Sequence, residues 1–297
     1  MKTKIFKHLF LVLFLILLVA CSTKKDTFLA RNSHALSTRD NILYNGQIAL
    51  DKGVISINSS TKDNFWKRLP IERMQIIDDS SPEGVSKNPD FEKAEEKATK
   101  AIQKHSMYID GQEKNYQIDE AYLLLGKARY YDQRFFPALE AFNYILYKYP
   151  TSSNINPAKI WREKTNMRLG NDAQVLKNIE KLLKEKKLKP QVVADTNALL
   201  AESFLNLEEK DSAIAKLKIA EKNTKINFEK TRYRFILGQL YQELGIRDTA
   251  LSYYQGVIDM NRKADREYII QAYAKRAQLF DFENGDSDAF VKRYNKL

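Results

Sequence analysis

The strongest pattern along the chain is a pair of amphipathic helices that recurs with a constant internal spacing. In each copy, a small residue of the first helix stands twelve positions before an alanine of the second. The three pairs are Gly126 and Ala138, Ala201 and Ala213, and Gly238 and Ala250. Small residues let two antiparallel helix backbones approach closely, and a large residue four positions later can fill the gap to the next pair. The pattern predicts an all-α protein built as a solenoid of stacked helix pairs.

The copy that begins at Asp119 also resembles the consensus of the tetratricopeptide repeat, a helix–turn–helix unit of ~34 residues. It matches that consensus at Tyr122, Leu125, Gly126, Ala138, Phe142 and Pro150. Repeats in this frame begin near positions 119, 156, 194 and 231, so the period is 37 or 38 residues. The spacing predicts a right-handed superhelical solenoid of tetratricopeptide-like helix pairs, with somewhat longer helices or loops than the standard repeat.

One repeat within this series is weaker than the others. In the repeat that begins near Asn156, Glu163 and Val175 stand where the stronger repeats have their small residues. A turn at 169–171 and an apolar stripe after it still predict a helix pair there.

The first repeat is interrupted by an insertion. A first helix is expected around Gly46 and a second around 91–107, and residues 54–89 lie between them, so the solenoid is predicted to span 39–297. The insertion carries Trp66, Arg68 and Arg73, and aromatic and cationic side chains of this kind are enriched at protein–protein interfaces. The alternative is that Trp66 only packs the insertion onto the helices.

The amino terminus has the pattern of an export signal. Three lysines and no acidic residue precede the apolar run at 9–20, which is shorter than the ~20 residues of a membrane-spanning helix. Leu18-Val19-Ala20-Cys21 resembles a bacterial lipobox, in which the cysteine thiol receives a diacylglyceryl group. We therefore expect residues 1–20 to be a cleaved signal peptide and 21–38 a lipidated tether. Stable anchoring needs two or more acyl chains, which a lipidated cysteine at the new amino terminus can carry. The alternative is an uncleaved membrane helix.

Charge adds little to this picture. The chain has a net charge of +11, and removal of the three lysines of the predicted signal peptide lowers it to +8. Most lysines alternate with glutamates along predicted helices, which is typical of a solvated face. The excess could favour acidic lipid headgroups or an acidic partner, and we expect no nucleic acid as a partner in an exported compartment.

No motif for catalysis stands out. The three histidines have no metal-ligand spacing around them, and no glycine-rich phosphate loop or G-x-S-x-G element is present in the sequence. We expect no enzyme activity and no cofactor other than the covalent lipid on Cys21.

A repeat solenoid instead offers a concave groove lined by its first helices, where proteins or peptides bind. The helical phase places a set of residues on this groove: Lys127, Tyr130, Glu202, Arg232, Phe235 and Gln239. The alternative for each single residue is a solvated groove wall.

Several stretches resemble the SprE (PorW) family of gliding-motility lipoproteins. These are CSTKKDTFLARNSHALSTRDNILYNGQIALDKG, KDNFWKRLPIERMQI and the helical repeats that follow. The resemblance implies a tetratricopeptide lipoprotein anchored in the outer membrane through Cys21 and facing the periplasm. It also implies a role in type IX protein secretion and gliding motility, with other proteins of that machinery as partners, and it supplies no catalytic residues.

The sequence departs from that family in length, because family members are considerably longer than 297 residues. The last predicted helices, at 267–280 and from Ser287 onward, also lack the polar capping helix that closes a solenoid. We therefore expect the sequence to be the amino-terminal part of something longer. Two other functions stay open: a general outer-membrane assembly lipoprotein, and an envelope factor that binds peptidoglycan or lipid.

Overall fold

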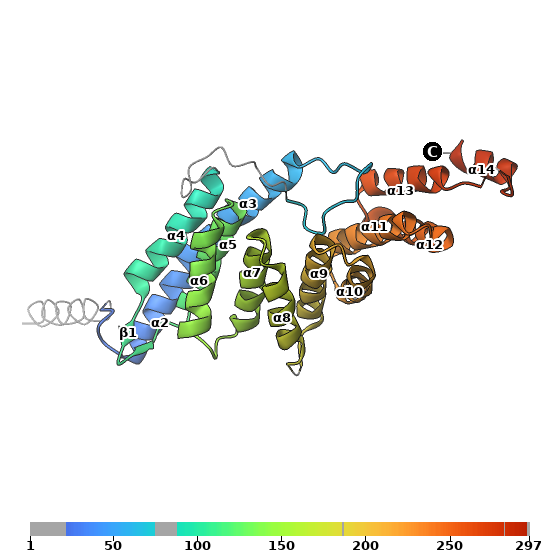
Figure 1. Ribbon diagram of the computed structural model, residues 1–297. Helices are drawn as coiled ribbons and strands as arrows, with labels where there is room; N and C mark the ends of the chain where they lie inside the picture. The colour runs from blue at the N-terminus through green and yellow to red at the C-terminus, as the bar shows by residue number, and fades with distance from the viewer. Residues whose placement is uncertain (1–21, 75–87, 186, 282, 296–297) are drawn as a thin grey trace, which may run out of the picture. The chain divides into compact units, whose positions relative to one another are not determined.

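The protein is an all-α helical solenoid in the computed structural model, as the sequence predicts (Figure 1). The structure describes residues 22–74, 88–185, 187–281 and 283–295. The predicted signal peptide at 1–20 and Cys21 lie outside the described residues. Among the residues that are described, no helix is long and apolar enough to cross a membrane.

The chain forms two compact units. Unit 1 comprises the described residues up to Thr61 together with Met74–Asn171, and unit 2 comprises Lys62–Arg73 and the described residues from Asp172 onward. The helices and strands of unit 1 are α2 (Phe28–Leu36), the π-helix η1 (Ser37–Leu43), α3 (Tyr44–Ser60), α4 (Pro89–His105), β1 (Tyr108–Ile109), β2 (Gln112–Glu113), α5 (Ile118–Tyr131), α6 (Phe135–Lys148) and α7 (Ile155–Arg168). Those of unit 2 are α8 (Asp172–Leu183), α9 (Pro190–Asn206), α10 (Lys210–Asn223), α11 (Asn227–Glu243), α12 (Arg247–Ile258), the 3-10 helix η2 (Asn261–Lys263), α13 (Arg266–Gln278) and α14 (Ser287–Tyr294).

The small residues of the repeat frame lie where the two helices of a pair meet. A Cβ atom added at Gly126 in α5 would lie 2.4 Å from the Phe142 ring of α6, and one at Gly238 in α11 would lie 2.6 Å from the Tyr254 ring of α12. The alanines of the second helices, Ala138, Ala213 and Ala250, are fully buried. The large residue four positions later therefore packs against the glycine of its own pair, rather than mainly bridging to the next repeat.

The boundary between the units falls in the weak repeat. Unit 1 ends at Asn171, after α7, and unit 2 begins at Asp172, with α8. Glu163 of α7 is buried, and its carboxylate pairs with Arg162 at 2.6 Å and accepts a hydrogen bond from the Asn166 amide. The helix pair that lacks small residues at its two key positions is thus the one that the unit boundary divides.

Helical structure begins inside the segment predicted as a tether. Thr27 accepts a hydrogen bond from the Ala30 amide and so caps α2, which buries Ala30, His34 and Ala35. The structured part of unit 1 therefore starts before residue 39. This helix lies outside the repeat frame and buries only three of its residues.

Candidate functional site

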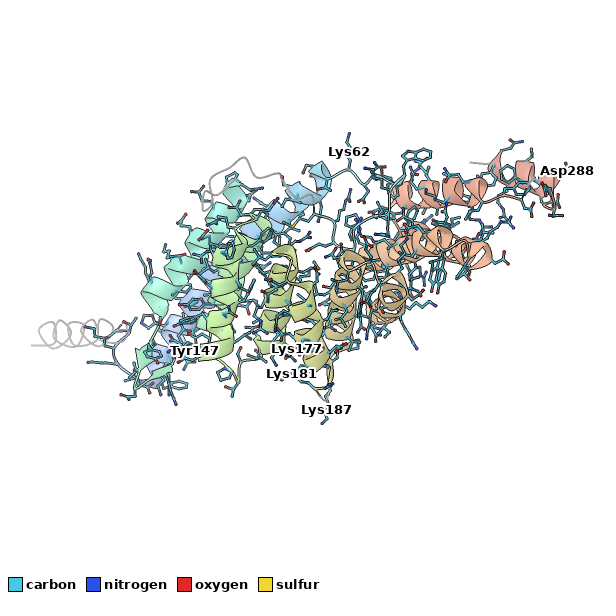
Figure 2. The ribbon with its side chains drawn as sticks, viewed as in Figure 1. Lys62, Tyr147, Lys177, Lys181, Lys187 and Asp288 are labelled. Carbon is cyan, nitrogen blue, oxygen red and sulfur yellow. The ribbon has the colours of Figure 1, made fainter. Side chains whose placement is uncertain are left out.

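Residues 62–73, which we call the strap, contact unit 2 although their chain neighbours Thr61 and Met74 belong to unit 1. Figure 1 shows this segment beside α11 and α13, and Figure 2 labels Lys62 at its start. All strap residues are described, and they form turns and bends rather than a helix or strand. We call the side of unit 2 that contacts the strap, formed by α9, α11 and α13, the first-helix face.

Two side chains of the first-helix face bind the main chain of the strap. The Gln239 side-chain amide donates to the Lys67 carbonyl over 2.8 Å, and its oxygen accepts from the Leu69 amide over 3.0 Å. The Glu202 carboxylate accepts from the Ile71 amide over 2.6 Å. These bonds satisfy backbone groups of a non-helical segment, and an extended polypeptide of another sequence offers the same groups.

Arg232 joins the strap main chain to a buried charge. Its Nε donates to the carbonyls of Pro70 and Ile71, at 2.9 and 3.1 Å, and its Nη1 donates to the Asp63 carboxylate at 2.8 Å. The side chains of Arg232 and Asp63 are only 1% and 3% exposed. The Tyr268 hydroxyl also donates to Asp63 over 2.9 Å, and burial raises the pKa of this phenol well above its usual value, so it stays a donor.

Three apolar side chains of the strap belong to the core of unit 2. Phe65, Leu69 and Ile71 are buried in the same cluster as the apolar residues of α11 and α12. The Phe65 ring meets the rings of Phe235 and Tyr268 edge to face, with centroids 5.2 Å apart in both cases. Burial of each of these side chains is worth about 1.5–3 kcal/mol, so the strap is held firmly.

The residues predicted for the insertion take different positions on the strap. Trp66 is 83% exposed, and the Lys275 ammonium lies 5.7 Å from the centroid of its ring. Arg68 forms a 2.9 Å ion pair with Glu243, the last residue of α11. Arg73 lies 3.4 Å from the Asp63 carboxylate. Trp66 therefore presents its ring to solvent, Arg68 fastens the strap to α11, and Arg73 pairs with Asp63 within the strap.

The contacts on the first-helix face repeat at one register position. Glu202 in α9, Gln239 in α11 and Lys275 in α13 each directly follow a glycine or alanine of their helix, and each contacts the strap. The strap runs against the order of the repeats, so its last residues meet α9 and its earlier ones meet α13. The same register position in α5 of unit 1 is Lys127.

The structure places the two predicted groove residues of unit 1 differently from each other. The Lys127 ammonium lies 5.6 Å from the centroid of the Trp161 ring, and burial lowers the pKa of this lysine. Tyr130 does not face a groove. It is fully buried, its ring packs edge to face on Phe135 and Trp161, and its hydroxyl accepts a bond from Arg168.

The helical phase explains the position of Tyr130. It stands four residues after Gly126, so it lies on the same side of α5 as this glycine, toward α6. Glu120 and Leu123 of α5 correspond in register to Arg232 and Phe235 of α11. Leu123 is buried in the core of unit 1, whereas Glu120 lines a surface hollow. Alignment of the repeats on their small residues would have identified Glu120 from the sequence.

Unit 1 carries a hollow on the side of η1, α3 and α5. It has a volume of about 570 Å³, and its lining includes Arg39, Tyr44, Gln117, Glu120 and Leu124. Tyr44 is 63% exposed. The hollow offers one aromatic ring, one cation and the two carboxylates of Asp40 and Glu120, and Arg39 pairs with Asp40 at 2.6 Å. This lining suits a polypeptide of mixed chemistry rather than an apolar ligand.

Part of the chain is similar to a known protein family. Residues 120–152, which span α5 and α6, match the tetratricopeptide-repeat family model. The fold and this match support a tetratricopeptide-repeat protein, a non-catalytic class whose repeats generally mediate protein–protein binding. In the comparison with curated proteins, none matched the chain.

Proposed function

We propose that this protein is a periplasm-facing lipoprotein, anchored in the outer membrane through Cys21, that acts as a protein–protein interaction scaffold in type IX secretion and gliding motility. The observation that carries the scaffold role is that side chains of three successive first helices already bind a non-helical polypeptide segment, the strap. The lipobox-like sequence before Cys21 supports the anchor. The resemblance of the amino-terminal stretches to the SprE (PorW) family supports the place in secretion.

The hollow of unit 1 is the surface we assign to a partner in this proposal. Its Tyr44 ring and its Arg39 guanidinium, which pairs with Asp40 at 2.6 Å, are of the types enriched at protein interfaces. The first-helix face of unit 2 is covered by the strap, so a partner that binds there must first displace it.

The test is affinity capture of the full lipidated chain from native envelopes, followed by mass spectrometry. We expect recovery of the translocon barrel and the periplasmic ring proteins of the secretion machine, and reduced recovery with Tyr44→Ala. Thr23→Ala, a change outside the hollow, is the matched control. Recovery of barrel-assembly factors alone, or of wall material, would replace the proposal with one of the two other envelope functions.

The anchor has its own test. We expect Cys21→Ser to leave the protein in the soluble fraction after salt washing, because the acyl chains supply the membrane affinity. Persistent pelleting of this variant with membranes would contradict the lipid anchor while leaving the scaffold role untouched.

A further inference from the structure

The strap contacts unit 2 as a bound peptide would. Its contacts with the first-helix face run from side chains of the helices to main-chain atoms of the strap, and to the Asp63 carboxylate and apolar side chains. At its exposed edge, Arg68 pairs with Glu243 and the Trp66 ring lies beside Lys275. None of these contacts is part of the hydrogen bonding within α9, α11 or α13, so those helices keep their own backbone bonds without the strap.

We propose that the strap is an exchangeable internal ligand, and that the first-helix face accepts in its place an extended segment of a partner protein with the same chemistry. That segment carries a carboxylate two residues before a phenyl ring and, four residues after the ring, an aliphatic–proline–aliphatic run. This inference rests on the proposed function, because it names the class of segment that the scaffold binds.

The carboxylate is required by Arg232. This guanidinium is 1% exposed and cannot lose its proton, so any occupant must bring a negative charge to the place of Asp63. The Tyr268 hydroxyl donates to the same carboxylate and therefore adds a second, directional contact. A segment with an amide at this position would leave the guanidinium without a counter-charge.

The ring and the proline are required by shape and by hydrogen bonding. Phe65 meets Phe235 and Tyr268 edge to face, a contact that an aliphatic side chain cannot reproduce. Pro70 has no amide hydrogen to leave unpaired, and its carbonyl accepts from Arg232. Proline also holds the segment extended before binding, which lowers the entropy lost on association.

The strap is covalently connected to the unit that it binds, and this connection explains why it acts as a regulator. A segment held on a short linker has an effective concentration of the order of millimolar, so a partner segment at lower concentration competes poorly. The first-helix face therefore opens to a partner that matches the strap chemistry and is also held nearby by another contact, such as one in unit 1.

The first test uses the wild-type full chain in detergent and a synthetic peptide of sequence KDNFWKRLPIER. Hydrogen exchange is followed at the amides of Leu69 and Ile71, which bond to Gln239 and Glu202. We expect these amides to exchange at least about tenfold faster than the slowest amides of α11, and faster still with excess peptide, because the strap opens without unfolding the helices. Equal rates for strap and α11, unchanged by peptide, would overturn the proposal.

The second test measures the affinity of the fluorescent peptide for strap variants. We expect Asp63→Ala with Phe65→Ala to bind it about tenfold or more tightly than the wild type, because the internal competitor is weakened. Lys62→Ala, at an exposed strap position, is the matched control and should stay within about twofold, since surface changes have small effects. A peptide with asparagine in place of its aspartate should bind the double variant at least about tenfold more weakly.

The outcomes separate this inference from the proposed function. Unchanged peptide affinity in a double variant with wild-type helix content by circular dichroism would overturn strap exchange, whatever the envelope capture recovers. Peptide exchange combined with capture of only wall material or barrel-assembly factors would uphold the strap mechanism and reject type IX secretion as its setting. If the double variant loses helix, the exchange rates of the wild-type chain decide alone.

Discussion

At the scale of single residues, the buried pair of Asp63 and Arg232 links the strap to α11. A buried ion pair gains stability only when its remaining hydrogen-bonding groups are satisfied. Here the Asp63 carboxylate accepts from Arg232 and Tyr268, and the guanidinium also donates to two strap carbonyls. Among the described residues, only the Arg232 Nη2 of this pair is buried without a hydrogen-bond partner. The pair therefore acts as a specific lock between a non-helical segment and a helix, and removal of one partner leaves a buried charge.

We predict that Asp63→Ala lowers the free energy of unfolding of unit 2 by about 3 kcal/mol, the low end for a broken buried pair, because release of the strap lets water reach Arg232. The measurement is hydrogen exchange of the slowest α11 amides. Asp288→Ala, at an exposed position of α14 labelled in Figure 2, is the matched control and should change the value by no more than about 0.5 kcal/mol. Equal effects of the two substitutions would show that the pair contributes nothing.

At the scale of elements, the close crossing of two helices depends on one missing side chain in the first of them. Gly238 in α11 faces the Tyr254 ring, which is fully buried and accordingly has little room to move. Gly256 in α12 has no such neighbour, since an added Cβ would find its nearest atom 3.7 Å away, on the flexible Arg234 side chain. Gly238 is therefore required for the close helix crossing, whereas Gly256 is not.

We predict that Gly238→Ala destabilises unit 2 by about 1–3 kcal/mol, because the added methyl overpacks the crossing and outweighs the helix propensity it adds. Gly256→Ala should instead stabilise the same unit by up to about 1 kcal/mol, through helix propensity alone. Both changes in the free energy of unfolding are measured by urea unfolding, monitored through hydrogen exchange of the α11 and α12 amides. A stabilising effect of both alanines would mean that the α11–α12 crossing tolerates a side chain.

The spacing of small residues was enough to predict the helix pairs, because that spacing is itself the condition for close packing. It also identified Glu202, Arg232, Phe235 and Gln239 as one face of the solenoid, and the structure brings all four against the strap. It placed Tyr130 wrongly, because this residue stands four positions after Gly126 and therefore lies on the buried side of α5.

The strap itself could not be predicted from the sequence. It has no helical or strand periodicity, and its partners lie between 131 and 205 positions further along the chain. Local pattern shows that such a segment is an insertion but does not show where it binds. Only the tertiary fold reveals that the predicted binding face and the predicted insertion are each other's partners.

At the scale of the whole molecule, the chain is divided into two units that differ in their titratable groups. Among the described residues both histidines, His34 and His105, belong to unit 1, where their Nδ1 atoms lie 3.0 Å apart. In a neutral pair one Nδ1 donates and the other accepts, so the contact tolerates at most one added proton. Burial lowers the pKa of His105, and the neighbouring His34, Lys100 and Lys104 lower it further.

This arrangement predicts that mild acid weakens unit 1 and spares unit 2. The folded-state pKa of His105 lies below its unfolded value of ~6.5, so below that pH the unfolded chain takes up the proton first. The stability that depends on the neutral histidine is thus complete above pH ~6.5 and is lost as the pH falls toward the folded pKa. We expect the protection factors of α4 amides to fall between pH 7.5 and 5.5 while those of α11 stay nearly constant, and His105→Gln to flatten the response of α4. A parallel fall of both helices, or an unchanged response in the glutamine variant, would place the acid sensitivity outside the histidine pair.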